Sequence, residues 1–101
     1  MRLKKRFFQK LDDCDVTFRV QPEDAESVAL VIDSNGWSPI RMERLKSGSF
    51  KTTLRLPLDS RFQFRYLVDG DDWHNDRAAD AYVANEFGES NSIVETFRNG
   101  S

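Results

Sequence analysis

The sequence has little of the chemistry on which catalytic and metal sites usually depend. Its 101 residues include one cysteine, Cys14, and one histidine, His74. A single cysteine cannot form an intrachain disulfide, and a chain without a disulfide framework fits a reducing compartment, so we expect a cytoplasmic protein. Because zinc binding and Cys–His catalysis both need partners that these two residues lack, no cofactor and no metal are expected.

Long apolar runs and strong basicity are also missing. No stretch approaches the roughly 18 consecutive apolar residues that a membrane span requires. The basic start, Met1–Lys10, is not followed by an apolar segment, so it does not have the form of a secretory signal. The formal net charge is −2, which gives no general electrostatic attraction to nucleic acid. We therefore expect neither a membrane nor a nucleic acid as partner.

What the sequence does contain is one clear strand with two different faces, within Phe62–Trp73. The residues of its apolar face are Phe62, Phe64, Tyr66 and Val68. This period of two is typical of a half-buried strand, and Asp69-Gly70 after it is a turn signal. The other face presents Gln63 and Arg65, and Trp73 follows on a polar loop. We expect this second face to be the working surface.

Further short runs between turn signals predict more strands. They are Val16–Val20, Ser27–Asp33, Ile40–Lys46, Phe50–Leu56 and Ser92–Phe97. The period of Ile40–Lys46 is imperfect, so we expect a bulge or an early end there, and Pro57 is expected to end its strand. Arg77–Ala84 is interpreted as an irregular crossover with at most one turn of helix. Strands at this spacing predict an all-β, immunoglobulin-like antiparallel β-sandwich of about six to eight short strands.

The length predicts one domain with two short flanking segments. We place a basic N-terminal arm at residues 1–14, the immunoglobulin-like domain at 15–97 and a C-terminal tail at 98–101. The arm is interpreted as a partly ordered tail or a short helix that packs Phe7, Phe8 and Leu11 onto the sandwich. An arm that docks an acidic partner or RNA is the alternative.

Four stretches, in order along the chain, carry a family resemblance. They are Asn35–Trp37, Phe50–Pro57, Phe64–Trp73 and Phe87–Val94. None is specific alone, but the ordered combination resembles the isoamylase early-set domains, which are the family 48 carbohydrate-binding modules, and is most similar to their free-standing bacterial versions. The resemblance covers roughly residues 15–96. It implies a non-catalytic module that binds glycogen-like or starch-like α-glucan.

The resemblance also implies the residues of a carbohydrate-binding site. Trp37 and Trp73 stand where the family has its two sugar-stacking tryptophans, and Phe87 stands where a leucine inserts against the curved glucan. Arg65 takes the place of a lysine that bonds sugar hydroxyls, and Asn91 matches an asparagine that does the same. Indole rings suit this task because they stack on the C–H patches of pyranose rings with little loss of conformational entropy.

Two features depart from the family pattern. The family includes the glycogen-binding domain of the AMP-activated kinase β subunit, and Glu89 falls where this kinase member has a threonine. Its carboxylate can accept hydrogen bonds from hydroxyls, as the amide of Gln63 can, but it would repel a phosphorylated glucan. The turn before Trp73 is also one residue longer than in the kinase version, so the position of Trp73 is less closely tied to the family than that of Trp37.

Other readings of the same residues stay open at this point. Tryptophan in a small sandwich is often a core residue, so core packing competes with sugar binding at both indoles. The acidic residues of 69–76 surround His74 and could suggest paired glycosidase carboxylates, but four acids after a turn are more simply a solvated loop. Their order does not match a calcium loop either. We expect no enzymatic activity.

The expected partner is an α-1,4-glucan or a related oligosaccharide. A glycogen-metabolism enzyme or a regulatory protein is a further partner that the free-standing form suggests. The alternative function is a protein-interaction or regulatory sandwich without glycan binding, which docks a partner through the same aromatic face or through the basic arm. Convergence of Trp37, Trp73, Arg65 and Asn91 on one face is the feature that would favour sugar over protein.

Overall fold

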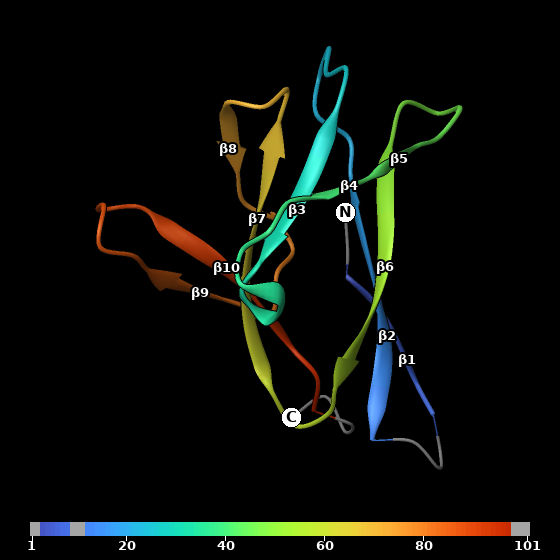
Figure 1. Cartoon of the computed structure of the whole chain (residues 1–101), viewed down its shortest axis with the longest axis vertical. Helices are drawn as coiled ribbons and strands as arrows, with labels where there is room; N and C mark the ends of the chain where they lie inside the picture. The colour runs from blue at the N-terminus through green and yellow to red at the C-terminus, as the bar shows by residue number, and fades with distance from the viewer. Residues whose placement is uncertain (1–2, 9–11, 98–101) are drawn as a thin grey trace.

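The computed structural model describes residues 3–8 and 12–97, which form two antiparallel sheets packed face to face (Figure 1). One sheet has the order β1-β2-β6-β5, made of Lys4–Phe7, Asp13–Val20, Phe50–Pro57 and Glu43–Arg44. The other has the order β4-β3-β7-β10-β9, made of Ile40–Arg41, Val28–Ile32, Arg61–Val68, Ser90–Glu95 and Ala81–Ala84. β8, Asp72–His74, pairs with β7 beside this path. The expected all-β sandwich is confirmed.

The core lies between the two sheets and uses alternate residues of each strand. Phe64 and Tyr66 of β7 and Phe18 of β2 are fully buried there. The Phe64 ring meets Phe18 edge-on at a centroid distance of 5.0 Å and Tyr66 at 5.7 Å. Such edge-to-face pairs contribute beyond the area that they bury. Cys14 is buried in the same core, and this burial raises the pKa of its thiol.

A buried polar pair fixes the segment after β8 to the core. The Tyr66 hydroxyl donates to Asp76 Oδ2 at 2.7 Å, and both residues are almost inaccessible to solvent. Asp76 Oδ1 accepts from the backbone N–H of Ala78, and the Asp76 N–H donates to Ser92 Oγ on β10. Burial, together with the neighbouring carboxylate, raises the pKa of Tyr66 far above its ordinary value. The apolar face of β7 therefore holds one satisfied polar contact.

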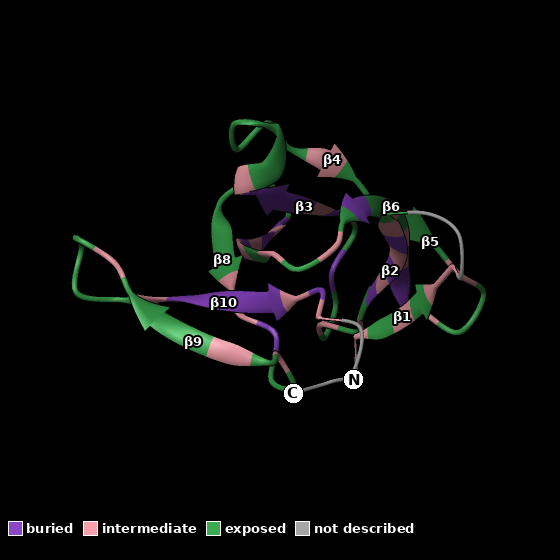
Figure 2. Ribbon diagram, turned by 90° about the horizontal axis from the view of Figure 1, so that it is seen from below, coloured by how far each residue is buried: buried purple, intermediate pink, exposed green. Residues whose placement is uncertain are grey.

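β7 is the central strand of its sheet, and two strands share one of its edges. β10 pairs with the first half of β7, where Ser92 lies opposite Phe64 and Glu95 opposite Arg61. β8 pairs with the second half, where Trp73 lies opposite Leu67. The hairpin β9–β10 therefore leaves the sheet where β8 begins to pair with β7, and it projects from the body of the molecule (Figures 1 and 2).

The expected conformation of the N-terminal arm is wrong for the part that the structure describes. Lys4–Phe7 is a strand that pairs along β2, with Lys4 opposite Thr17 and Phe7 opposite Cys14. Alternation explains the difference, because charged Lys4 and Arg6 are exposed while Phe7 packs against the core. Leu11, also expected to pack down, and the tail 98–101 lie outside the described residues.

The irregular run Ile40–Lys46 changes sheets instead of forming one strand. Ile40 and Arg41 pair with β3, whereas Glu43 and Arg44 pair with β6 in the opposite sheet. Met42 lies between the two short strands and is buried, and its N–H donates to the carbonyl of Val28 at 2.9 Å. The early end that the sequence predicted is confirmed, and the imperfect period reflects a crossing between two sheets.

The interpretation of Arg77–Ala84 as an irregular crossover is wrong for its second half. Ala81–Ala84 is β9, which pairs with β10 so that Tyr82 lies opposite Ser92. The alanines favoured neither strand nor loop in isolation, and hydrogen bonding to β10 decides the conformation. The described residues consequently hold ten strands, more than expected, and three of them, β4, β5 and β8, have only two or three residues.

The remaining corrections concern strand ends. β2 begins at Asp13 rather than Val16, because Asp13 and Cys14 find partners on β6. β6 ends at Pro57, as expected, but the proline is itself the last residue of the strand. It pairs with Asp13 in the last position of the ladder, where the missing N–H of proline is tolerated. β10 spans Ser90–Glu95, two residues earlier than expected at its start. Among the described residues, no helix is long and apolar enough to cross a membrane.

Candidate functional site

The outward face of the six-stranded sheet gathers most of the residues that the sequence singled out. The ladder fixes which side chains share it, because Arg65 lies opposite Val31, Gln63 opposite Ile93, and Leu67 opposite Trp73. We call this surface the outer face; it is made of Ala29 and Val31 of β3, Gln63, Arg65 and Leu67 of β7, Trp73 of β8, and Asn91 and Ile93 of β10. Val31 and Ile93 are buried although they lie outside the core cluster, so they form an apolar floor.

Arg65 occupies the centre of the outer face, beside the point where β8 and β10 part. Its guanidinium carbon lies 5.3 Å from the centroid of the Trp73 ring, within cation–π range. Its Nη1 donates to Glu89 Oε1 at 3.0 Å. The Nε atom is buried and has no hydrogen-bond partner among the described residues. Arg65 therefore connects the indole on β8 to the loop between β9 and β10.

Trp73 presents its indole to solvent, with 46% of the residue exposed. The alternative that it packs in the core is therefore excluded. The direct partner of Trp73 on β7 is Leu67. Arg65 lies two residues before Leu67 on the same face of β7, so it is the diagonal neighbour of Trp73. One ring face meets the guanidinium, and the exposed remainder is available for contact with a ligand.

Trp37 is also exposed, at 41%, and belongs to a strained loop at the other end of β7. Its backbone φ is +68°, a region that residues other than glycine rarely adopt. The Asn35 side chain closes the loop, since its Oδ1 accepts from the Ser38 N–H at 3.1 Å and its Nδ2 donates to the Ser38 carbonyl at 3.1 Å. Asp33 Oδ1 accepts from the Gln63 N–H at 3.1 Å, which fixes the loop to β7.

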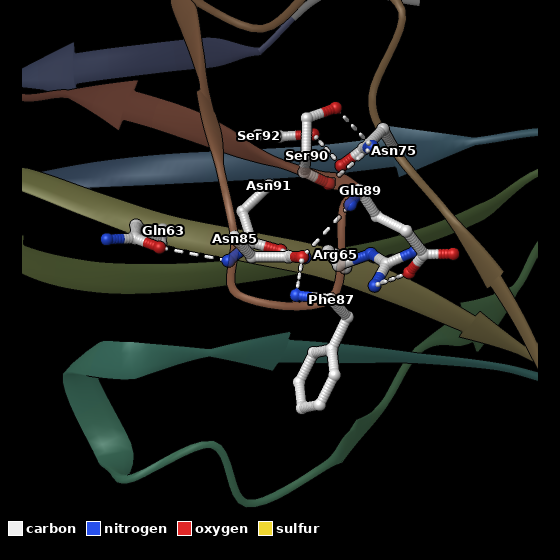
Figure 3. A network of polar contacts seen from close by, with 9 residues as sticks. All are labelled: Gln63, Arg65, Asn75, Asn85, Phe87, Glu89, Ser90, Asn91 and Ser92. Atoms are coloured by element: carbon white, nitrogen blue, oxygen red, sulfur yellow. Dashed lines mark hydrogen bonds and ion pairs between the residues drawn. The ribbon is translucent and has the colours of Figure 1, made fainter.

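Phe87 is the most exposed large apolar residue that the structure describes, at 79%. It lies in the loop between β9 and β10, and its ring points away from the polar side chains around it (Figure 3). Asn85 Oδ1 accepts from the Phe87 N–H at 2.9 Å and from the Glu89 N–H at 3.1 Å. The backbone of this loop is therefore held by one side-chain amide, and the exposed ring is not part of any core.

Asn91 is less accessible than the sequence suggested, with 8% exposed. Its Nδ2 donates to Gln63 Oε1 at 2.9 Å, and its Oδ1 accepts from Asn85 Nδ2 at 3.3 Å (Figure 3). Both the oxygen and the nitrogen of the Asn91 side-chain amide thus already have partners inside the site. The side chain forms part of the scaffold, and one N–H of its Nδ2 is not committed to these bonds.

The structure adds three residues that the sequence reasoning missed: Asp33, Asn75 and Asn85. Asn85 precedes Phe87 by two positions, as Asn35 precedes Trp37. An asparagine two residues before an exposed aromatic was therefore an available signal, because asparagine side chains bond the backbone that follows them. Nothing in the sequence pattern pointed to Asp33 or Asn75, whose partners are distant along the chain.

The acidic residues of 69–76 are dispersed by the fold. Asp69 accepts from the N–H groups of Glu26 and Ser27, Asp76 is buried against Tyr66, and Asp72 contacts His74 at 2.9 Å. In the described part of the chain, no three residues of metal-ligand type group together. These acids have separate roles in the fold and do not form a pair of facing carboxylates.

One cleft among the described residues is lined by residues that lie outside the outer face. It has a volume of about 670 Å³ and is lined from both sheets, among others by Arg19, Gln21, Asp72, His74 and Arg77. Its lining mixes both signs of charge and contains neither of the tryptophans. We base the candidate site on the outer face, since an exposed sheet face with flat aromatic rings needs no deep cavity to bind a chain-like ligand.

No known protein family and no curated protein matches this sequence. Solved structures do share the fold. The enterobactin esterase FES from Shigella flexneri matches with a TM-score of 0.76 and 13% identity over 94% of this chain and 32% of the esterase. Pullulanase type I from Bacillus subtilis, complexed with maltose, gives 0.61 and 20% over 94% and 13%. A candidate α-amylase from Salmonella typhimurium gives 0.62 and 16% over 90% and 14%.

These similarities concern a minor part of each larger protein. This chain spans about a third of the esterase and about a seventh of the two other proteins. At such low identities the match establishes the β-sandwich fold alone. Of the similar structures, one is named as an α-amylase and one as a pullulanase, and the pullulanase was solved with maltose.

Proposed function

We propose that the outer face binds α-glucan without acting on it. The observation that carries this proposal is the exposure of two indoles at opposite ends of β7, with Arg65 between them. The loop of Trp37 is fixed to Gln63 and Trp73 lies opposite Leu67, four residues further along the strand. This corresponds to roughly 13 Å along β7, which a short oligosaccharide can span.

The residue types suit a neutral sugar. The rings of Trp37 and Trp73 offer flat apolar area for pyranose C–H patches, and Phe87 offers a third apolar contact from the side of the hairpin. Arg65 donates to hydroxyls, and the remaining N–H of Asn91 adds a second donor. The site shares this combination of aromatic stacking and a few polar groups with carbohydrate-binding proteins in general.

Glu89 changes how a ligand would approach Arg65. Its carboxylate already bonds the guanidinium at 3.0 Å, and the Glu89 side chain is largely exposed. A sugar hydroxyl bonding the same guanidinium either shares it with Glu89 or accepts from one of the remaining N–H groups. Because the carboxylate also accepts from hydroxyls, the Arg65–Glu89 pair acts as one donor and acceptor unit for neutral ligands, and it disfavours a phosphorylated glucan.

Binding of this kind is weak and insensitive to salt. Two stacked rings and a few hydrogen bonds that compete with water give a Kd of about 0.1–1 mM. The ligand carries no net charge, so screening removes little of the attraction. The pullulanase structure with maltose supports an α-glucan as the ligand class, since a related fold occurs in that enzyme. We place the chain in the cytoplasm, with a glycogen-metabolism enzyme or a regulatory protein as a further partner.

The test is a titration of ¹⁵N-labelled protein with maltoheptaose and β-cyclodextrin, following the two indole N–H signals. We expect both signals and the amides of Arg65 and Asn91 to shift, and we expect cellohexaose, a β-linked chain of similar length, to shift them far less. Trp37→Ala should abolish the shifts while its spectrum stays that of a folded protein. No shift at millimolar maltoheptaose would refute glucan binding, and docking of a protein through the same aromatic face would become the leading function.

A further inference from the structure

The hairpin β9–β10 has little ladder support at its outer end. The last pair between β10 and β7 joins Ser92 to Phe64. Beyond it, β7 pairs with β8 from Tyr66 onward, so the start of β10 has no strand partner on that side. The hairpin nevertheless presents Phe87 and Glu89, two residues of the proposed glucan site. Side chains must therefore hold this end of the hairpin in place.

Asn75 replaces one part of the missing ladder. Its Nδ2 donates to the Ser90 carbonyl at 2.8 Å, and its Oδ1 accepts from Ser92 Oγ at 2.8 Å (Figure 3). A strand partner would have bonded the same carbonyl through a backbone N–H. Asn75 follows directly after β8, the strand of Trp73. Its side chain thus fixes the base of the hairpin relative to the indole.

Asn85 holds the outer end. Its Oδ1 accepts from two backbone N–H groups, those of Phe87 and Glu89. Its backbone N–H donates to the Glu89 carbonyl at 2.9 Å, and its own carbonyl accepts from Gly88 at 3.3 Å. Asn85 thus forms hydrogen bonds with the residues that follow it in the loop, and the phenyl ring of Phe87 points outward (Figure 3).

Asn85 also connects this loop to the centre of the sheet. Its Nδ2 donates to Asn91 Oδ1, and Asn91 donates in turn to Gln63 Oε1 on β7. The Gln63 N–H donates to Asp33, at the start of the Trp37 loop. A continuous series of hydrogen bonds therefore joins the loop of Phe87 to the loop of Trp37 through Gln63.

We propose that Asn85 is a positioning residue that orders the loop 85–89 and so holds Phe87 and Glu89 in place for the ligand. This inference rests on the proposed glucan function for the identity of the ligand, but the ordering of the loop does not depend on it. The side chain itself needs no contact with sugar. Its effect comes from removing loop freedom before binding, which lowers the entropy that the ligand must otherwise overcome.

The test compares Asn85→Ala and Asn85→Asp with Gln21→Ala as matched control. Gln21 is a side-chain amide that also bonds a turn, through Ser47 and Ser49, but on the four-stranded sheet. Asn85→Ala removes all the side-chain bonds, whereas Asn85→Asp keeps an acceptor for the two N–H groups and loses the donor to Asn91. Two properties are measured in each variant: the ¹⁵N order parameters of Phe87 and Glu89 without ligand, and the Kd for maltoheptaose.

We expect Asn85→Ala to lower the order parameters of both amides from about 0.8 to about 0.6 and to raise the Kd about tenfold. Asn85→Asp should keep most of the order and give a Kd between those of the unmodified protein and Asn85→Ala. Gln21→Ala should change neither the order parameters nor the Kd. Unchanged order parameters in Asn85→Ala would overturn the positioning role. Lower order with an unchanged Kd would overturn its importance for the ligand. If the unmodified protein binds no maltoheptaose, the proposed function fails, and the order parameters still decide whether Asn85 orders the loop.

Discussion

The guanidinium of Arg65 lies between the indole of Trp73, 5.3 Å from its ring centroid, and the carboxylate of Glu89, 3.0 Å away. Arg65 is on β7, Trp73 on β8 and Glu89 in the β9–β10 loop, so three separate segments meet at one side chain. The cation–π contact keeps the guanidinium over the ring, and the ion pair orients it toward the hairpin. This arrangement determines what the outer face offers to a ligand.

Arg65→Ala should weaken maltoheptaose binding by about five- to tenfold, because the central hydroxyl donor is lost. It should lower the free energy of unfolding by only about 1 kcal/mol, since a cation–π contact and a partly exposed ion pair contribute modestly. Arg65→Lys should recover part of the affinity. Calorimetric titration and urea unfolding measure the two effects. An unchanged affinity of folded Arg65→Ala for maltoheptaose would contradict the role given to Arg65.

Trp37 allows the loss of the indole to be separated from the loss of backbone strain. Because its φ is +68°, Trp37→Gly removes the ring and relieves the strain, whereas Trp37→Ala removes the ring alone. Both variants should lose glucan binding, and Trp37→Gly should be the more stable by about 0.5–1 kcal/mol. Chemical denaturation of the two variants in parallel gives the difference. Equal stability would indicate that the loop relaxes once the indole is absent.

The Tyr66–Asp76 contact predicts a loss of stability in alkaline solution. The pKa of Tyr66 is raised on folding, so its contribution is fully present below about pH 10, where the unfolded tyrosine is still protonated. Above that pH the unfolded chain loses the proton while the folded chain keeps it. The free energy of unfolding should therefore fall by up to about 1.4 kcal/mol per pH unit from this group.

Tyr66→Phe isolates this effect. The variant should be less stable at pH 7 by about 1–3 kcal/mol, because Asp76 loses a buried donor. Its deficit should shrink as the pH rises from 10 to 11, since phenylalanine does not ionise. Denaturation curves at several pH values measure both. Cys14 is present in both proteins, so its own raised pKa cancels in the comparison. Parallel pH profiles would argue against the assignment.

An ion pair between β1 and the residue that precedes β9 offers a test of the N-terminal strand. Lys5 of β1 donates to Asp80 Oδ2 at 2.6 Å, and the same oxygen accepts from the Glu95 N–H at 2.8 Å. Lys5→Met should cost less than about 1 kcal/mol, whereas Asp80→Ala should cost about 2 kcal/mol because a backbone donor on β10 also loses its partner. Thermal unfolding at low and high salt measures both, and salt should reduce only the Lys5 effect. Equal losses would mean that the Glu95 contact contributes nothing.

Local pattern was sufficient for much of the fold. The alternation of Phe62–Val68 identified the central strand and its buried face. In a strand, a period of two places all the apolar side chains on one face, and that face must be the buried one. The same reasoning found most of the strands and the early end near Met42. It failed at Ala81–Ala84, where the strand propensity is weak, and at Lys4–Phe7, where most residues are charged. Both segments become strands because a neighbouring strand supplies their hydrogen bonds.

For the candidate site, sequence by itself determined the residue types and their order: two tryptophans on loops, an arginine on the polar face of a strand, and an aromatic followed by glycine before the last strand. It could not determine that Asn91 is nearly buried, that Arg65 pairs with Glu89, or that Asn75 and Asp33 hold the loops. These contacts join residues from 15 to 30 positions apart. Only the tertiary structure decides them, because they depend on which strands and loops lie beside β7, and no local pattern encodes that arrangement.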